Sequence, residues 1–166
     1  MVRATVVALL TWLCFSPTLF AAWSISEADG EGSVDTAYIE NSARQRADIF
    51  LDEHDVVYLR LRLSAGFETL TRSSCPTFQI DKRLPLHHYA VGKQCSIDSK
   101  DATIVLGQIS DKQINSLVLH RIMNGNKVTF RYTTENGQYR KAEFSLQNSK
   151  QALQGAVGAD TEVTVD

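Results

Sequence analysis

Two cysteines and two histidines near the middle of the chain are the residues best suited to chemistry. Cys75 and Cys95 bracket the adjacent residues His87 and His88. A thiolate beside an imidazole is the nucleophile and base of a cysteine hydrolase, and both groups also bind zinc. Adjacent residues of an extended segment point to opposite faces, so the two histidines rarely hold one ion together. Two cysteines are also too few for a structural zinc site. We therefore expect no metal, no cofactor and no catalysis.

The N-terminal segment predicts export. Arg3 supplies one positive charge, an apolar run follows over residues 4–15, and Pro17 precedes a pair of small residues, Ala21 and Ala22. This is the layout of a secretory signal peptide, so we expect cleavage after Ala21 or Ala22 and a periplasmic or secreted protein. A retained membrane anchor is the alternative. It is disfavoured because Trp23 is followed by polar sequence without a cluster of positive charges.

The cysteines that survive such cleavage predict one disulfide. Cys14 lies within the signal segment, which leaves Cys75 and Cys95. An even pair in an exported chain normally pairs, and closing a loop of about 20 residues contributes roughly 3 kcal/mol. Two free buried thiols are the alternative. A redox-active pair is disfavoured because a Cys-x-x-Cys spacing, which lowers a thiol pKa, is absent.

Length and charge bound the organisation of the chain. Of the 166 residues, 1–22 are assigned to the signal peptide, 23–154 to a single domain and 155–166 to a disordered tail of small and polar residues. Loss of Arg3 with the signal changes the net charge from −2 to −3. A mildly acidic domain of this kind is a poor nucleic-acid binder. No apolar run after the signal is long enough to span a membrane.

Alternating apolar and polar residues predict a β-rich domain. The clearest strand covers residues 56–63, where Leu59 and Leu61 alternate with Arg60 and Arg62. One face of such a strand packs on a core and the other faces water, as in many antiparallel sheets. Other strands are expected at residues 34–40, 47–51, 68–70, 77–80 and 102–109, with a loop at 82–93. The fold class is therefore mostly β, an antiparallel β-sandwich or curved sheet.

Two helices are expected beside the strands. Residues 110–124 have apolar side chains at helical spacing, and Ser110 with Gln113 forms a capping box. Gly125 is placed to end this helix in the left-handed conformation. A short C-terminal helix is expected from Asn148 or Ser149 to about residue 154.

A hairpin is expected between these helices. A two-residue Asn136–Gly137 turn would pair apolar with polar positions. A three-residue loop, 135–137, instead pairs Phe130 with Ala142 and places apolar residues on one face. It requires Gly137 in the left-handed conformation of a bulged turn.

Basic residues suggest a binding surface for an anionic partner. Five of them lie in the loop between the cysteines, and others project from the polar faces of predicted strands. The candidate binding residues are Arg60, Arg62, Lys82, Arg83, His87, His88 and Lys93, with Arg131 and Lys141 as further strand cations. The alternative is a solvated sheet face with local ion pairs, such as Glu143 near Arg131.

The C-terminal third of the chain resembles the invasion-associated locus B family of exported bacterial proteins. The resemblance rests on residues 117–125 (LVLHRIMNG), 127–130 (KVTF), 142–146 (AEFSL) and 148–153 (NSKQAL). Trp23 and the cysteine pair that lies ahead of the strand at 102–109 also fit. It implies a periplasmic or surface-exposed β-sandwich-like domain that is associated with host-cell entry in some bacteria. It implies no established catalytic activity, and it supplies no site residues because none form a family motif in this sequence.

These observations favour an exported, non-catalytic accessory or binding protein of a Gram-negative envelope. Its expected partner is a protein or an anionic glycan or lipid. The alternative is a periplasmic inhibitor or immunity-type protein that blocks a hydrolase through the cysteine-closed loop around His87 and His88. An unrecognised hydrolase is the third hypothesis.

Overall fold

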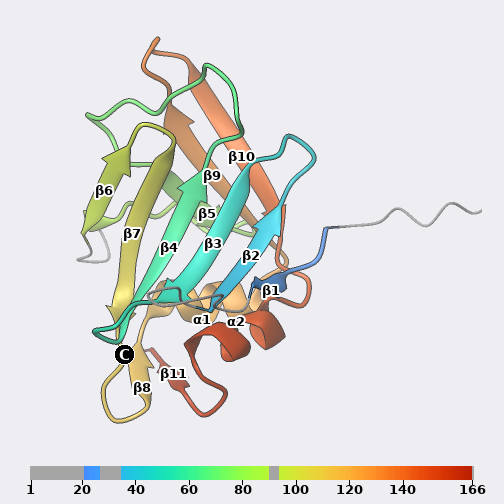
Figure 1. Ribbon diagram of the computed structural model, residues 1–166, viewed down its shortest axis with the longest axis vertical. Coiled ribbons are helices and arrows are strands. Elements are labelled where there is room, and N and C mark those ends of the chain that lie inside the picture. The colour runs from blue at the N-terminus through green and yellow to red at the C-terminus, as the bar shows by residue number, and fades with distance from the viewer. Residues whose placement is uncertain (1–20, 27–34, 90–93, 166) are drawn as a thin grey trace, which may run out of the picture.

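The computed structural model describes residues 21–26, 35–89 and 94–165, which form a mostly β fold with two helices (Figure 1). The predicted signal segment lies outside these residues except for Ala21 and Ala22, and Lys93 of the predicted binding loop also lies outside them. Among the described residues, no helix has both the length and the apolar character needed to cross a bilayer.

The larger sheet has six antiparallel strands in the order β1-β2-β3-β4-β7-β6. Its strands are β1 (Ser24–Ser26), β2 (Thr36–Glu40), β3 (Arg46–Leu51), β4 (Val56–Arg62), β6 (Cys95–Asp98) and β7 (Asp101–Gln108). The alternation along β4 has the predicted consequence: Leu59 and Leu61 are buried in the core, whereas Arg60 and Arg62 lie on the outer face. Strands β1 and β6 were not predicted, and the strand expected at 68–70 is reduced to one bridge between Leu70 and Thr134.

The smaller sheet has three antiparallel strands in the order β10-β9-β5. They are β5 (Thr77–Ile80), β9 (Lys127–Thr133) and β10 (Tyr139–Ser145). The predicted hairpin register is confirmed, with Phe130 opposite Ala142 and Val128 opposite Phe144. Gly137 has a φ of 76°, as the three-residue loop requires.

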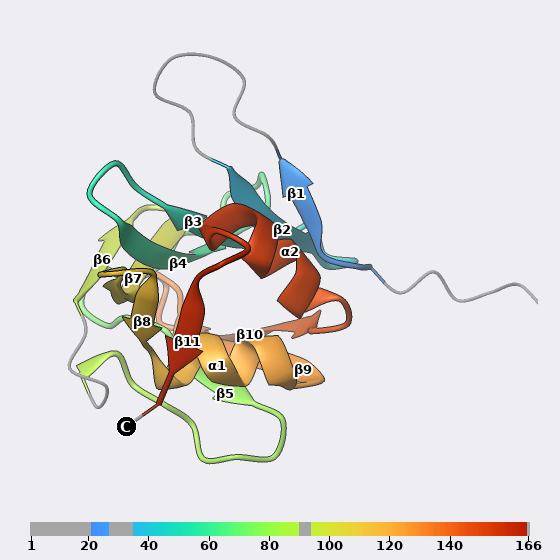
Figure 2. The same cartoon turned by 90° about the horizontal axis from the view of Figure 1, so that it is seen from below.

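The two sheets face each other across a single apolar core (Figure 2). Phe78 and Phe130 from the smaller sheet are fully buried, as are Ile49 and Leu59 from the larger one. One open side is closed where Trp23 Nε1 donates to the carbonyl of Ser145 at 2.9 Å. The opposite side is closed by the disulfide Cys75–Cys95, which joins the chain just before β5 to the first residue of β6. The predicted disulfide is thus confirmed.

Helix α1 (Leu117–Asn124) begins seven residues after the predicted start. Ser116 is its N-cap, and the Ser116 side chain accepts from the backbone N–H of Leu119. Ser110 and Gln113 instead bridge each other across a tight turn, in which Asp111 and Lys112 have positive φ. The capping-box prediction was wrong because this turn reverses the chain and puts the next residues into strand β8 (Gln113–Asn115).

The predicted left-handed Gly125 was also wrong, since its φ is −95°. Close packing explains a glycine at this position. A Cβ there would lie 2.7 Å from Ile80 Cγ2 and 2.8 Å from the carbonyl oxygen of Arg121. No ordinary side chain fits against such neighbours without a shift of the structure.

The C-terminal segment is ordered where a disordered tail was expected. Helix α2 (Ser149–Val157) continues three residues past the predicted end and buries Ala156 and Val157. Strand β11 (Glu162–Thr164) then pairs in parallel with β8, and Lys112 forms an ion pair with Asp160 beside them. The tail prediction failed because a parallel partner 49 residues away leaves no local pattern. The two helices fill the space between the sheets at one end (Figure 2).

Candidate functional site

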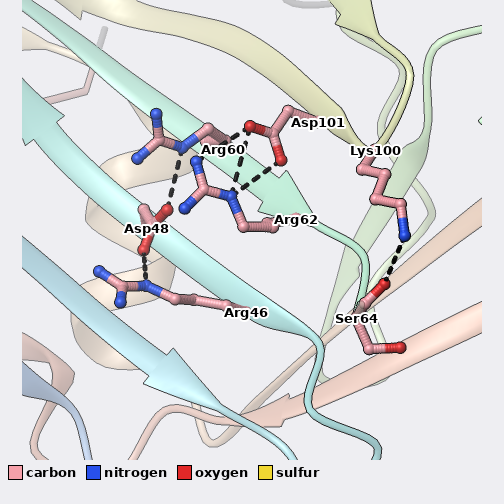
Figure 3. A network of polar contacts seen from close by, with 7 residues as sticks. All are labelled: Arg46, Asp48, Arg60, Arg62, Ser64, Lys100 and Asp101. Atoms are coloured by element: carbon pink, nitrogen blue, oxygen red, sulfur yellow. Dashed lines mark hydrogen bonds and ion pairs between the residues drawn. The ribbon is translucent and has the colours of Figure 1, made fainter. Parts of the chain in front are cut away.

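The outer face of the six-stranded sheet carries an ordered cluster of charges. It is built by the outward positions of β3 and β4 and by the first residue of β7. We call it the arginine face, and it consists of Arg46, Asp48, Arg60, Arg62 and Asp101 (Figure 3). Cross-strand register places these side chains together: Asp48 lies opposite Arg60, Arg46 opposite Arg62, and Arg62 opposite Asp101.

Asp48 is the centre of the arginine face. Its side chain is 0% exposed, and its two oxygens accept from Nε of Arg46 and, at 2.9 Å, from Nε of Arg60. A buried carboxylate is tolerated only when it is paired and hydrogen-bonded. Asp48 therefore fixes the positions of two guanidinium groups whose side chains are only about a quarter exposed.

The third arginine is held by a different acid. Arg46 and Arg62 lie directly opposite each other, an arrangement in which like charges destabilise a sheet. Asp101 draws Arg62 toward β7, accepting from its Nε and its Nη2 at 3.0 Å each. These hydrogen bonds raise the pKa of Arg62 above its ordinary value. Asp48 thus holds Arg46 on one side and Asp101 holds Arg62 on the other, which keeps the two like charges apart.

Aromatic rings support two of the guanidinium groups. Arg46 Cζ lies 4.0 Å from the ring centre of Tyr38, and Arg60 Cζ lies 4.8 Å from that of Phe50. Phe50 in turn stacks on Tyr58 with 5.3 Å between ring centres. Stacking of this kind restrains the planar guanidinium before any partner arrives.

The phenol of Tyr58 continues the ordered surface toward the β3–β4 turn. Its hydroxyl donates to Asp52 Oδ2 at 3.1 Å. Burial raises the pKa of Tyr58, and the Asp52 carboxylate raises it further. The neutral phenol is therefore the form that donates to Asp52 in the folded protein.

The arrangement can bind oxyanions. Asp48 engages Arg46 and Arg60 through Nε, so their terminal Nη groups are turned away from it (Figure 3). A guanidinium with a free Nη edge presents N–H donors at the spacing of a carboxylate, sulfate or phosphate. Because Asp48 and the rings already hold the side chains, less conformational entropy is lost on binding.

The predicted loop residues lie elsewhere. The loop begins at β5 of the smaller sheet, so its first residues, Lys82 and Arg83, lie on the opposite layer from the arginine face, and it ends at β6 of the larger sheet (Figure 2). Lys82 and Arg83 are exposed, and Arg83 lines a hollow of about 390 Å³ beside α1. His87 lines a separate hollow of about 500 Å³ together with Arg131. The described residues of the predicted patch therefore do not converge on one surface.

The strand cations outside β4 have local partners. Arg131 donates to Gln79 Oε1 at 2.6 Å rather than lying beside Glu143. Glu143 instead pairs with Lys141 at 3.2 Å and Lys127 at 3.5 Å. The hydrogen bond from Lys141 is the main reason why the pKa of Glu143 is lowered. This part of the surface fits the solvated alternative.

Three members of the arginine face were missed by sequence reasoning: Arg46, Asp48 and Asp101. Asp48 sits in the run Arg46-Ala47-Asp48-Ile49-Phe50, which alternates only in part, and its acid looks like an ordinary surface residue. Only the pairing of β3 with β4 puts it against Arg60.

The described residues also contain one group of three side chains suited to a metal ion. Its members are Cys75, His88 and Cys95, all half-buried, and their ligand atoms lie within 4.8 Å of one another. Both histidine rings contact Tyr89, but in different ways: His87 stacks on it with its Nδ1 3.3 Å from the Tyr89 hydroxyl, whereas the His88 ring meets it edge-on. The two adjacent histidines thus do not share a site, but His88 lies beside the disulfide.

Comparison with known proteins relates this chain to one solved fold. No family model and no curated protein sequence matches the chain. Its structure is similar to the crystal structure of invasion associated protein B from Bartonella henselae, with a TM-score of 0.56 and 14% sequence identity. The match covers 86% of this chain and 96% of that chain. At this identity the similarity concerns the fold.

Proposed function

We propose that this chain is an exported, non-catalytic accessory protein that binds an anionic partner through the arginine face. The observation that carries the proposal is the pre-ordered set of guanidinium groups around Asp48, with terminal Nη groups turned outward. The fold similarity to invasion associated protein B and the disulfide agree with membership of the invasion-associated family and with export. The expected partner is an anionic glycan of the envelope or of a host surface.

Two features favour a glycan over a free small anion. The face is built on neighbouring strands of one sheet, so it can accept an extended chain whose charges repeat along its length. Tyr38 and Phe50 lie against the guanidinium groups of Arg46 and Arg60, so the outer face of each stacked guanidinium can contact a sugar while the charges are paired. An acidic protein or a lipid headgroup also carries negative charge, but neither presents it at regular intervals along an extended chain.

The test uses the domain from Trp23 onward and immobilised heparin, a sulfated polysaccharide, as the probe. The double variant Arg60→Gln/Arg62→Gln should elute at lower salt and bind at least about tenfold more weakly, because the arginine face loses two of its three positive charges. Binding of the unchanged protein should weaken as salt rises, since exposed charges are screened. Circular dichroism verifies that the variant retains its β structure.

A matched control separates the face from the overall charge. Lys82→Gln/Arg83→Gln also removes two positive charges, but from the opposite layer. It should change heparin binding by no more than about twofold, because salt screens charges that lie far from the arginine face. Equal weakening by both pairs would mean that only net charge matters. Unchanged binding by the Arg60/Arg62 variant would remove the arginine face from the proposal.

A loop-mediated inhibitor is a second candidate function. The disulfide-closed loop presents two large apolar side chains to solvent, since Leu84 is 84% exposed and Tyr89 is 67% exposed. An exposed apolar pair on a loop that is anchored at both ends is typical of a segment that inserts into a partner. Capture of a single hydrolase that is lost on Leu84→Ser/Tyr89→Ser, and unaffected by changes at the arginine face, would favour this function.

A further inference from the structure

The disulfide and the loop histidine form a cluster that the proposed partner binding does not use, and His88 is the member that closing the core does not require. Cys75 precedes β5, Cys95 begins β6, and His88 belongs to the loop between these strands. The two sulfurs and one imidazole nitrogen lie within 4.8 Å of one another. A disulfide alone needs no imidazole beside it, so the position of His88 calls for an explanation.

The donor set matches a thiophilic metal ion. Two thiolates and one imidazole are the protein ligands of catalytic zinc sites of the Cys₂His type, where a fourth position is left to water or substrate. Two thiolate charges balance one Zn²⁺, so the occupied cluster is neutral. Neutrality suits residues that are only partly exposed, since burial of an unbalanced charge is costly.

The backbone permits the change from disulfide to metal site. The Cα atoms of Cys75 and Cys95 are 6.5 Å apart, near the upper end of the disulfide range of about 4.4–6.8 Å. A Zn–S bond of about 2.3 Å with tetrahedral angles places two sulfurs about 3.8 Å apart. The Cα separation is compatible with this spacing after rotation of the two cysteine side chains.

The cluster also has access to solvent. Cys75 lines the hollow of about 500 Å³ described above, whose other lining residues include Ser74 and Thr77. A metal ion bound at Cys75 can therefore receive water in its fourth position from this hollow. The same opening admits a reductant to the disulfide.

We propose that reduction converts Cys75, His88 and Cys95 into a Zn²⁺ site, so that the chain carries either a disulfide or a metal ion. A dithiol reductant transfers two electrons and two protons to the disulfide: the S–S bond breaks, two thiols form, and the dithiol becomes a cyclic disulfide. Zn²⁺ then binds both sulfurs and the His88 imidazole and releases the two thiol protons. A disulfide oxidant reverses the step: it accepts two electrons from the two sulfurs and two protons from solvent, becomes a dithiol, and leaves the Cys75–Cys95 bond re-formed and the ion released.

The test compares oxidised and reduced protein with a spectroscopic probe. The chain is reduced with dithiothreitol, freed of it under anaerobic conditions, and titrated with Co²⁺, which gives a thiolate-to-metal absorption band when sulfur binds. Zn²⁺ should abolish this band with one ion bound per chain. The oxidised protein should give no band, because its sulfurs are bonded to each other.

Two histidine variants locate the third ligand. His88→Gln should weaken Zn²⁺ binding to the reduced chain by at least about tenfold. His87→Gln is the matched control and should leave the affinity unchanged, because His87 is not among the side chains whose ligand atoms converge, and its Nδ1 faces the Tyr89 hydroxyl. Equal affinity of the reduced wild type and His88→Gln would overturn the proposal, as would binding to the oxidised chain or no binding at all.

Circular dichroism covers the case in which reduction unfolds the domain. Zn²⁺ should then restore the β-sheet spectrum of the wild type and fail to restore that of His88→Gln, since binding to a formed site stabilises the fold. A reduced wild-type chain that stays unfolded in the presence of Zn²⁺ would refute the site.

Discussion

Asp48→Asn is the substitution that best tests the physical basis of the arginine face. The variant keeps the size of the side chain but removes the charge that holds Arg46 and Arg60. Removing one partner of a fully buried ion pair costs about 3–5 kcal/mol, because the other charge is left uncompensated. Here the acid is 0% exposed, but the arginines are 29% and 26% exposed and keep part of their hydration. We therefore expect a loss of about 2–3 kcal/mol in the free energy of unfolding.

The assay is urea unfolding followed by circular dichroism, with thermal unfolding alongside. At about 3 °C per kcal/mol for a domain of this size, the midpoint temperature should fall by roughly 6–9 °C. The slope of the free energy against urea should stay constant, because the surface exposed on unfolding is unchanged. Asp101→Asn is the matched control and should cost less than about 1 kcal/mol, since Asp101 and Arg62 are more exposed.

A double-mutant cycle with Arg60→Gln measures the coupling directly. Removing both members of the pair should cost less than the sum of the single losses by about 1 kcal/mol or more, because no uncompensated partner remains at that position. Additive losses, or an Asp48→Asn variant as stable as the wild type, would refute the view that a buried carboxylate organises this face.

Three further predictions concern stability. Cys75→Ser/Cys95→Ser should lower the free energy of unfolding by about 3 kcal/mol, as expected for a 20-residue separation, and dithiothreitol should then have no further effect in urea titrations. Gly137→Ala should cost about 1 kcal/mol in thermal unfolding, because φ is 76° and no atom crowds the position, so only backbone strain acts. Acid should destabilise the protein below about pH 5, because Lys141 lowers the pKa of Glu143 in the folded chain and the unfolded chain therefore binds a proton first. In urea titrations from pH 7 to pH 3, Glu143→Gln should reduce the part of the loss of unfolding free energy that Glu143 causes. An acid limb that is identical in Glu143→Gln would contradict the assignment.

Short-range patterns were sufficient for several parts of the fold. The alternation around Arg60 and Arg62 located β4, and the matching of apolar faces selected the three-residue hairpin loop over the two-residue one. Two cysteines left in a chain with a signal-like start were enough to predict the disulfide. In each case the deciding interaction is local in sequence or involves the only available partner.

Local patterns failed where a distant partner outweighed them. Ser110 and Gln113 have the residue types of a helix cap, but the chain turns there because β8 pairs with β11 near the C-terminus. The same pairing orders a tail whose composition is that of a disordered segment. Pairing energy from a remote strand is invisible in a window of a few residues, although it exceeds the local preference.

The sequence by itself determined the class of this protein: a small β-rich domain with one disulfide and arginines on the wet face of a strand. Only the tertiary structure decided what those arginines do. Cross-strand register buried Asp48 between Arg46 and Arg60, and layering of the two sheets separated them from the loop cations. Folding also brought His88 to the two sulfurs. The physical reason is that charge pairing and metal ligation act over a few ångströms of space, and which residues come that close depends on how distant strands pair and stack.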